Sequence, residues 1–210
     1  MTDHTDAREA LRTAELELML QRERVAELRR ALPPGPVVEG HIFDEGPADL
    51  SQDGPIVQRT LGDLCTDRPL VLYHFMFGNA FVEPCPMCTM WADGWNGLRR
   101  PLEQRIDFAI VTSAPIADTR DLARQRGWDD LRLLSAAGSS FKRDIGGEDA
   151  DGGLSPFVSV YERDGDDVRL SYAGSAHISG DHWRGVDLLS PVWHLLDLTR
   201  PGRGDWMPDL

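Results

Sequence analysis

The first 35 residues have the hydrophobic spacing of one long helix. Residues 5–32 contain no Gly or Pro, and apolar side chains recur there every three or four positions. The positions on this face are Leu11, Ala14, Leu18, Gln21, Val25, Leu28 and Leu32. Such spacing places them on one side of a helix, which Pro33 and Pro34 would end. We predict a helical arm over residues 1–35, whose apolar face packs either on the rest of the chain or on a second copy as a homodimer.

Short apolar runs in the remainder of the chain have the length of strands. Residues 70–77 are almost continuously apolar, which is typical of a strand buried on both faces, and residues 106–112 and 131–135 resemble them. Residues 157–161 and 168–172 flank an Asp- and Gly-rich turn and predict a hairpin. Helices are expected over 88–104, 116–126 and 183–198, whereas residues 36–60 are predicted to be mainly loop.

The order of these elements predicts the fold class. Strand, helix, strand, helix and strand supply crossovers to a parallel sheet, and the late hairpin adds an antiparallel edge. We therefore expect an α/β, thioredoxin-like mixed sheet with helices on both faces, preceded by the long N-terminal helix. The expected boundaries are an arm at 1–35, a domain at 36–200 and a tail at 201–210.

Composition narrows the classes of partner. The net charge of −13 argues against nucleic acid and anionic membranes, because both recruit clustered Lys and Arg. No apolar run has the length of about 18 residues that a membrane-spanning helix needs. The N-terminus also lacks the basic start and apolar stretch of a secretory signal, so we predict a cytoplasmic protein.

The chain has three cysteines, and two of them carry the expected chemistry. Cys65 follows an apolar stretch and is interpreted as a small buried residue. Cys85 and Cys88 form a Cys-Pro-Met-Cys sequence after a predicted strand and at the start of a predicted helix. A thiolate is favoured at a helix N-terminus, and a second cysteine one turn along can attack a mixed disulfide. We expect Cys85 to be the exposed nucleophile and Cys88 the buried resolving thiol.

Other residues extend this site or offer an alternative to it. Ser155-Pro156 precedes the hairpin, where thioredoxin-like active sites place a cis-proline facing the cysteines, so Pro156 is a further catalytic candidate. His177 and His182 lie in the loop after the hairpin and, with Cys85 and Cys88, are candidate ligands for copper or zinc. His74 is interpreted as a hydrogen-bonded core residue. Arg143-Asp144 are expected either to place a cation near the thiols or to form a surface ion pair.

Several segments together resemble the DUF899 family of thioredoxin-like proteins, described as predicted dithiol-disulfide oxidoreductases. The segments are residues 29–33, 73–78, the cysteine pair, 91–97, 141–144 and 183–187. The resemblance extends from about Ala7 to Gly204 and implies the thioredoxin-like fold and redox-active Cys85 and Cys88. Residues 173–182 depart from the family pattern, and the two histidines in that segment favour the metal hypothesis.

Four functions follow from these observations. The first is a thiol–disulfide oxidoreductase acting on a small thiol or a protein disulfide, with no cofactor beyond its own disulfide. The second is a copper- or zinc-binding protein or metalloenzyme. The third is a peroxide-reducing enzyme, but Val82 stands where such enzymes usually carry Thr or Ser three residues before the nucleophile. The fourth is a non-catalytic interaction module that works through the N-terminal helix.

Overall fold

The computed structural model describes residues 4–179 and 184–208, which divide into two compact units, Met1–Gly35 and Pro36–Leu210. The first unit is helix α1 (His4–Arg30), which confirms the predicted N-terminal helix. None of the described residues of α1 is buried, although one face carries the apolar side chains noted above. No helix in the described parts of the chain has both the length and the apolar content needed to cross a bilayer.

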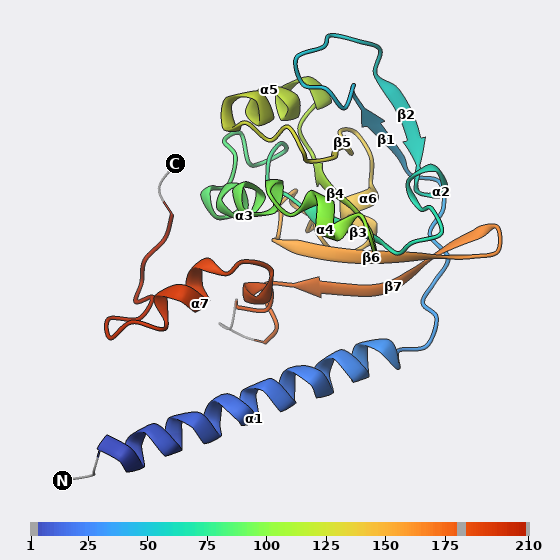
Figure 1. The fold of residues 1–210 in the computed structure, drawn as a ribbon. Coiled ribbons are helices and arrows are strands. Elements are labelled where there is room, and N and C mark those ends of the chain that lie inside the picture. The colour runs from blue at the N-terminus through green and yellow to red at the C-terminus, as the bar shows by residue number, and fades with distance from the viewer. Residues whose placement is uncertain (1–3, 180–183, 209–210) are drawn as a thin grey trace. The chain divides into compact units, whose positions relative to one another are not determined.

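The second unit is built on one seven-stranded mixed sheet with the order β2-β1-β5-β4-β3-β6-β7 (Figure 1). Its strands are β1 (Ile42–Glu45), β2 (Val57–Thr60), β3 (Leu70–His74), β4 (Asp107–Thr112), β5 (Leu133–Ser135), β6 (Phe157–Asp164) and β7 (Asp167–Ser175). Strands β3, β4 and β5 are parallel, and the antiparallel hairpin β6–β7 extends the sheet beyond β3. This arrangement confirms the mixed sheet expected from the element order.

Residues 36–60 are mainly loop, as predicted, but they also contain two short strands at the opposite edge of the sheet. Strands β1 and β2 pair there as an antiparallel hairpin, and β1 also pairs with β5. Only Phe43 is buried in these two strands, and β2 has no buried residue. An edge hairpin with so few buried side chains lacks the alternating pattern by which strands are recognised in a sequence.

The helices of this unit are α2 (Leu61–Leu64), α3 (Pro86–Asn96), α4 (Arg99–Leu102), α5 (Ile116–Arg126), α6 (Phe141–Asp144) and α7 (Val192–Leu196). The predicted helix 116–126 is confirmed, and Gly127 ends it in a left-handed conformation with φ 68°. The predicted helix 88–104 is instead two helices separated at Gly97 and Leu98. The predicted helix 183–198 is also wrong in extent: within its described part, a 3₁₀ turn at Asp187–Leu189 is separated from α7 by Ser190 and Pro191.

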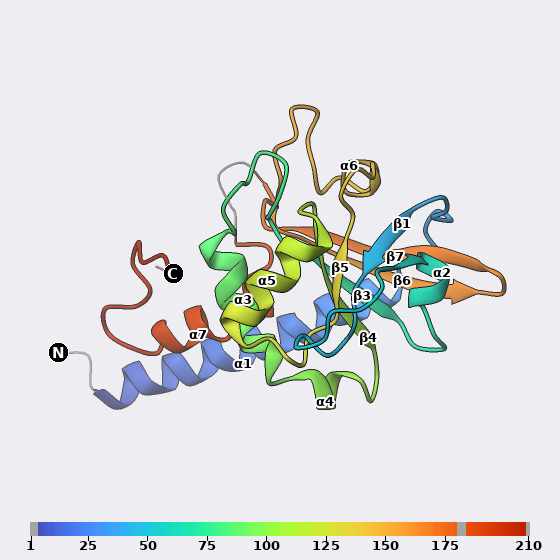
Figure 2. The ribbon, with the colours of Figure 1, turned by 90° about the horizontal axis from the view of Figure 1, so that it is seen from above.

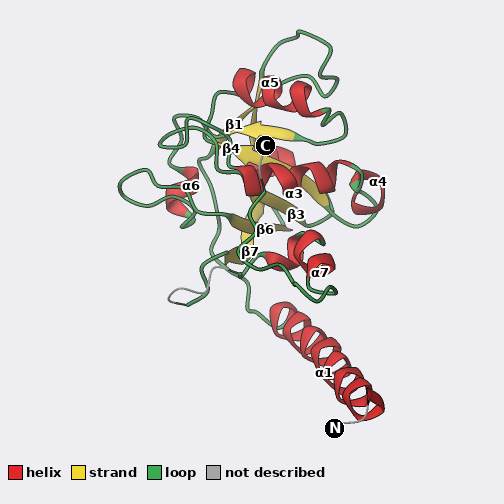
Figure 3. Ribbon diagram, turned by 90° about the vertical axis from the view of Figure 1, so that its left-hand side faces the viewer, coloured by secondary structure: helices red, strands yellow, loops and turns green. Residues whose placement is uncertain are grey.

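Two hydrophobic cores lie on opposite faces of the sheet, as the alternation of side chains in a strand requires. Tyr73, Ile110 and Val158 face a core that is completed by α3, α5 and Trp193. Leu72 and Val111 face the second core, which includes residues of α2 and α6. Helices α3 and α5 lie on the same side of the sheet in Figures 1 and 2, and Figure 3 looks onto this helical layer. Helices therefore cover both faces, as predicted.

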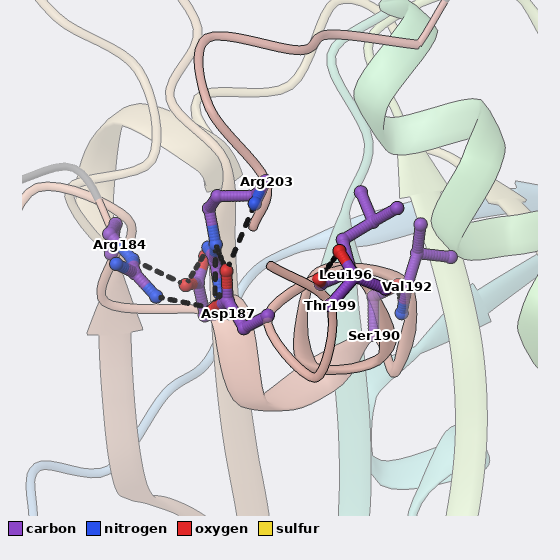
Figure 4. Close-up of polar contacts among 8 residues, drawn as sticks. Arg184, Asp187, Ser190, Val192, Leu196, Thr199 and Arg203 are labelled. Carbon is purple, nitrogen blue, oxygen red and sulfur yellow. Dashed lines mark hydrogen bonds and ion pairs between the residues drawn. The ribbon is translucent and has the colours of Figure 1, made fainter. Parts of the chain in front are cut away.

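The C-terminal segment is packed against α3. The Trp95 Nε1–H donates to the Leu189 carbonyl at 2.9 Å, and the Trp91 and Trp193 rings meet edge to face with centroids 5.6 Å apart. Asp187 is buried and binds Arg184 at 2.7 Å and Arg203 at 2.6 Å (Figure 4). This buried carboxylate with two cations links the 3₁₀ turn to the last residues of the chain. Trp91 and Trp95 also pack on Tyr73 of β3.

Candidate active site

The cysteine pair follows a tight loop at the carboxyl end of β3. The Phe77 carbonyl accepts hydrogen bonds from the Ser113 and Ala114 backbone N–H groups, which brings the loop against the end of β4. At Gly78 φ is +93°, and a Cβ there would lie 2.2 Å from the Ala114 nitrogen. Only glycine fits so close to another backbone. The loop then turns back, and the Cys85 N–H donates to the Met76 carbonyl at 3.1 Å.

Cys85 occupies the N-cap position of α3, with Pro86 in the first helical turn. Pro suits that position because the N–H that it lacks would have no partner inside the helix. The Cys85 carbonyl accepts from both the Thr89 N–H and the Thr89 hydroxyl at 3.0 Å, which anchors the first turn. The two cysteines therefore lie at the beginning of a helix, as predicted.

The two thiols have opposite environments. The Cys88 thiol donates a hydrogen bond to the Cys85 sulfur, and this contact is the main cause that lowers the pKa of Cys85 to about 6. Partial burial opposes the shift, while the N–H groups of Cys88 and Met87 in the first turn add to it without closing a capping hydrogen bond. A half-buried Cys85 with this pKa is largely thiolate at neutral pH.

Cys88 is fully buried directly behind Cys85. Its burial and its hydrogen bond to Cys85 raise the pKa of Cys88 well above the ordinary value. The Tyr73 hydroxyl donates to the Cys88 sulfur at 3.1 Å, and the Met76 N–H also forms a hydrogen bond to it. Both contacts favour the Cys88 anion and partly offset its burial. Of the two sulfurs, one is thus half-buried and acidic, and the other is fully buried and protonated.

The expected cis-proline is not present. No peptide bond among the described residues is cis, so the prediction for Ser155-Pro156 is wrong. The Ser155 N–H donates to the Gly147 carbonyl, and the Pro156 carbonyl accepts from Ala176. These hydrogen bonds hold residues 155 and 156 in place directly before β6. The peptide bond between them has the trans form, which X-Pro bonds favour.

The histidines have separate outcomes. His74 is 1% exposed and its Nε2 lies 2.7 Å from the Ser159 hydroxyl, which confirms it as a hydrogen-bonded core residue. His177 is exposed just beyond the end of β7, and His182 lies outside the described residues. Among the residues that the structure describes, no three His, Cys, Asp or Glu side chains form a group that could hold a metal ion. The copper or zinc site remains a prediction.

Three residues of the site were missed from the sequence: Tyr73, Met76 and Lys142. The sequence analysis considered Arg143 as a nearby cation, but Arg143 is half-exposed and pairs with Glu148. The buried cation is its neighbour Lys142, whose Nζ donates to the Phe75 carbonyl at 2.8 Å. The available signal was a single lysine beside Phe141 in a segment shared with the resembled family. Which of the two cations points inward depends on how α6 packs.

One cavity of about 350 Å³ lies away from the thiols. It is lined by residues that include Arg68, Asp107 and Phe108, where β3 and β4 begin. The cysteines follow the other end of β3, so this cavity is not part of the cysteine site.

Comparison with known proteins identifies a family and a fold. The family model described as "Bacterial protein of unknown function (DUF899)" matches residues 1–208. Among curated proteins, none matches the sequence.

Three solved structures illustrate the likeness in fold. Peroxidoxin BcpB from Mycobacterium tuberculosis is 21% identical, with a TM-score of 0.52 over 75% of this chain and 94% of that one. A PrxQ mutant from Xylella fastidiosa is 15% identical, with a TM-score of 0.53 over 77% and 95%. AhpC from Mycobacterium bovis is 16% identical, with a TM-score of 0.51 over 84% and 98%. At these identities the likeness concerns the fold, and it confirms the predicted thioredoxin-like architecture.

Proposed function

The chain belongs to the DUF899 family, and from this premise we propose that it is a thiol–disulfide oxidoreductase in which Cys85 attacks and Cys88 resolves. One observation carries the proposal. A half-buried cysteine at a helix N-terminus, with its pKa lowered to about 6, stands in front of a fully buried cysteine that donates a hydrogen bond to it. This asymmetry is what a two-step exchange requires, because the first thiol must react with outside sulfur and the second only with the first.

The first step uses the Cys85 thiolate. Its sulfur attacks one sulfur of a substrate disulfide, a mixed disulfide forms, and the other substrate sulfur leaves as a thiolate that takes a proton from water. The first-turn N–H groups of α3 stabilise the anion before attack.

The second step uses Cys88. Its thiol loses a proton, the resulting thiolate attacks the Cys85 sulfur, and the second substrate thiolate leaves. The pair loses two electrons, which the substrate disulfide gains. Cys88 gives up one proton to water, and water protonates both substrate thiolates, so that two substrate thiols form. A thiol or dithiol reductant then returns the Cys85–Cys88 disulfide to the reduced state, so that no bound cofactor is needed.

A disulfide is favoured over a peroxide as the oxidant. The neighbour in fold named peroxidoxin suggests a peroxide, but position 82 carries Val, a side chain without a hydroxyl. Val82 is 79% exposed and stands three residues before Cys85, so this position offers no hydroxyl that could bind a peroxide.

The test measures turnover of a disulfide substrate with dithiothreitol as reductant, and of hydrogen peroxide in parallel. Cys85→Ser and Cys88→Ser should each reduce disulfide turnover to the level of the uncatalysed reaction, and Cys88→Ser should accumulate a mixed disulfide detectable by mass. Cys65→Ser is the matched control and should retain activity, because Cys65 is buried in the second core. Turnover that survives loss of both Cys85 and Cys88 would refute the proposal.

Self-association through α1 is part of the proposal. The helix has an apolar face and no buried residue among those described, and the heptad pattern suits a second copy of the same helix. In an antiparallel pair Glu17 would face Arg24 and Glu15 would face Arg22, two attractive contacts against one repulsion between Arg8 and Arg29. A parallel pair would place Glu17 beside Arg22 and Arg24 beside Arg29, one attraction against one repulsion. Complementary charge therefore favours the antiparallel homodimer.

A further inference from the structure

Lys142 is a fully enclosed cation close to the cysteine pair. Its side chain is 1% exposed, and its Nζ donates to the Phe75 carbonyl at 2.8 Å. The Lys142 carbonyl accepts from the N–H groups of Gly147 at 2.7 Å and Glu148 at 3.1 Å, which fixes the backbone of this residue. Burying an ammonium group is unfavourable unless it meets charge or polarised oxygen. A lysine held in such a place has a use other than packing.

The carbonyl that Lys142 binds belongs to the peptide group between Phe75 and Met76. The N–H of that same peptide group, on Met76, forms the hydrogen bond to the Cys88 sulfur. An ammonium at the carbonyl end pulls electron density toward the oxygen and makes the N–H a stronger donor. One peptide group thus joins the Lys142 ammonium to the Cys88 sulfur.

The other ionisable groups near Lys142 are paired elsewhere or neutral, so its main polar contact is the hydrogen bond to the Phe75 carbonyl. Glu148 attracts the ammonium but is itself bound by Arg143 at 2.9 Å and by Asn79. Burial lowers the pKa of His74 well below its ordinary value, and the nearby Lys142 charge lowers it further. His74 is therefore neutral. Burial lowers the pKa of Lys142 to about 7, and this value already includes the opposing attraction of an anionic Cys88 and of Glu148. Lys142 can therefore gain its proton when Cys88 loses one.

We propose that Lys142 is a positioning residue for the resolving step, in which its ammonium, acting through the Phe75–Met76 peptide group, balances the charge of the Cys88 thiolate. The inference rests on the proposed function and adds to it the means by which a buried thiol ionises. Cys88 releases its proton to water and Lys142 takes one from water, so the net charge of the interior does not change. The Cys88 thiolate then attacks the Cys85 sulfur, the mixed disulfide breaks, and the substrate thiolate leaves.

The experiment separates the two steps with an aryl disulfide whose released thiolate is coloured, a dithiobis-nitrobenzoate. In a Cys65→Ala background the reduced protein should release one equivalent when Cys85 is labelled and a second when Cys88 resolves the mixed disulfide. Lys142→Met should leave the rate of the first release unchanged and slow the second at least tenfold at neutral pH. A nearby cation typically shifts the pKa of a paired group by one unit or more, and each unit changes the thiolate fraction about tenfold.

The pH profile and two further variants make the result specific. The rate of the second release increases with pH, and the midpoint of this increase should lie at least one pH unit higher in Lys142→Met than in the parent protein. Arg143→Met is the matched control: it removes the same charge from the next residue, leaves the Phe75 carbonyl bound, and should keep both rates. Lys142→Gln keeps a hydrogen-bond donor for the Phe75 carbonyl but removes the charge. It replaces Lys142→Met as the test variant if the Met variant does not fold, and it should also slow the second release.

The outcomes are distinguishable. A normal first release with an unchanged second release in Lys142→Met or Lys142→Gln overturns this inference and leaves the proposed function standing. A parent protein that releases no second equivalent overturns the resolving role of Cys88, and this inference falls with it.

Discussion

The acidity of Cys85 is the property on which the proposed chemistry depends most directly. With a pKa of about 6, roughly 90% of Cys85 is thiolate at neutral pH, whereas a thiol with the ordinary value of 9.0 is about 1% thiolate. The rate at which iodoacetamide alkylates Cys85 should therefore reach half its maximum near pH 6. The assay is the pH dependence of the alkylation rate of the reduced protein, followed on the peptide that contains Cys85.

Removing the main cause of the shift should move this midpoint. Cys88→Ala deletes the thiol that donates to Cys85, and a hydrogen bond to a charged group contributes about 1.5–3 kcal/mol, which corresponds to about one to two pKa units. We expect the midpoint to rise by that amount in Cys88→Ala. Cys88→Ser keeps a donor at the same position and should show a smaller rise.

Cys65 provides an internal control in the same protein. Burial raises the pKa of Cys65 to about 11, so it should remain unlabelled across the neutral range. A wild-type midpoint between about 8.5 and 9, the range of an unperturbed thiol, would refute the reasoning. So would a midpoint that does not change when Cys88 is replaced by Ala.

Four further predictions concern the second thiol, the core, the buried cation and the arm. Tyr73→Phe removes the hydroxyl that binds the Cys88 sulfur, so resolution of the mixed disulfide should slow several-fold while labelling of Cys85 is unchanged, measured by release of the coloured thiolate. Leu72→Ala should lower the free energy of unfolding by about 2–5 kcal/mol in urea titrations, because Leu72 is fully buried in a central strand. Between pH 7 and 10 Lys142 binds fewer protons in the folded than in the unfolded protein. The free energy of unfolding of the wild type should therefore rise with pH relative to that of Lys142→Met, by up to about 1.4 kcal/mol per pH unit. An equal pH dependence of the two free energies would contradict this. Deletion of residues 1–32 should convert a dimer into a monomer, as measured by sedimentation equilibrium. If the measured mass remains twice that of one chain after the deletion, α1 is excluded as the interface.

Patterns within a short stretch of sequence determined much of the fold. Helix 116–126 could be predicted to the residue because its apolar spacing is regular and Gly127 supplies the left-handed residue that ends it. The apolar runs located β3 and β4, since strands buried on both faces need apolar residues at successive positions. The Cys85–Cys88 spacing, between a buried strand and a predicted helix, likewise located the two thiols at the beginning of α3.

Other features depended on contacts between residues far apart in the chain, and the sequence could not show them. Strands β1 and β2 pair with each other at four positions, and β1 pairs with β5 at Asp44 and Ser135, whereas neither strand shows an alternating burial of its side chains.

The sequence by itself determined that two thiols would stand at the beginning of a helix at the end of a buried strand. Only the tertiary structure decided how differently the two thiols ionise. Their pKa values depend on burial, on the hydrogen bond between the two thiols, and on the Tyr73 hydroxyl and the Met76 N–H, which the fold brings to Cys88 from 15 and 12 residues away. Electrostatic interactions act through space and are strengthened by the exclusion of water, so they cannot be seen until the chain is folded.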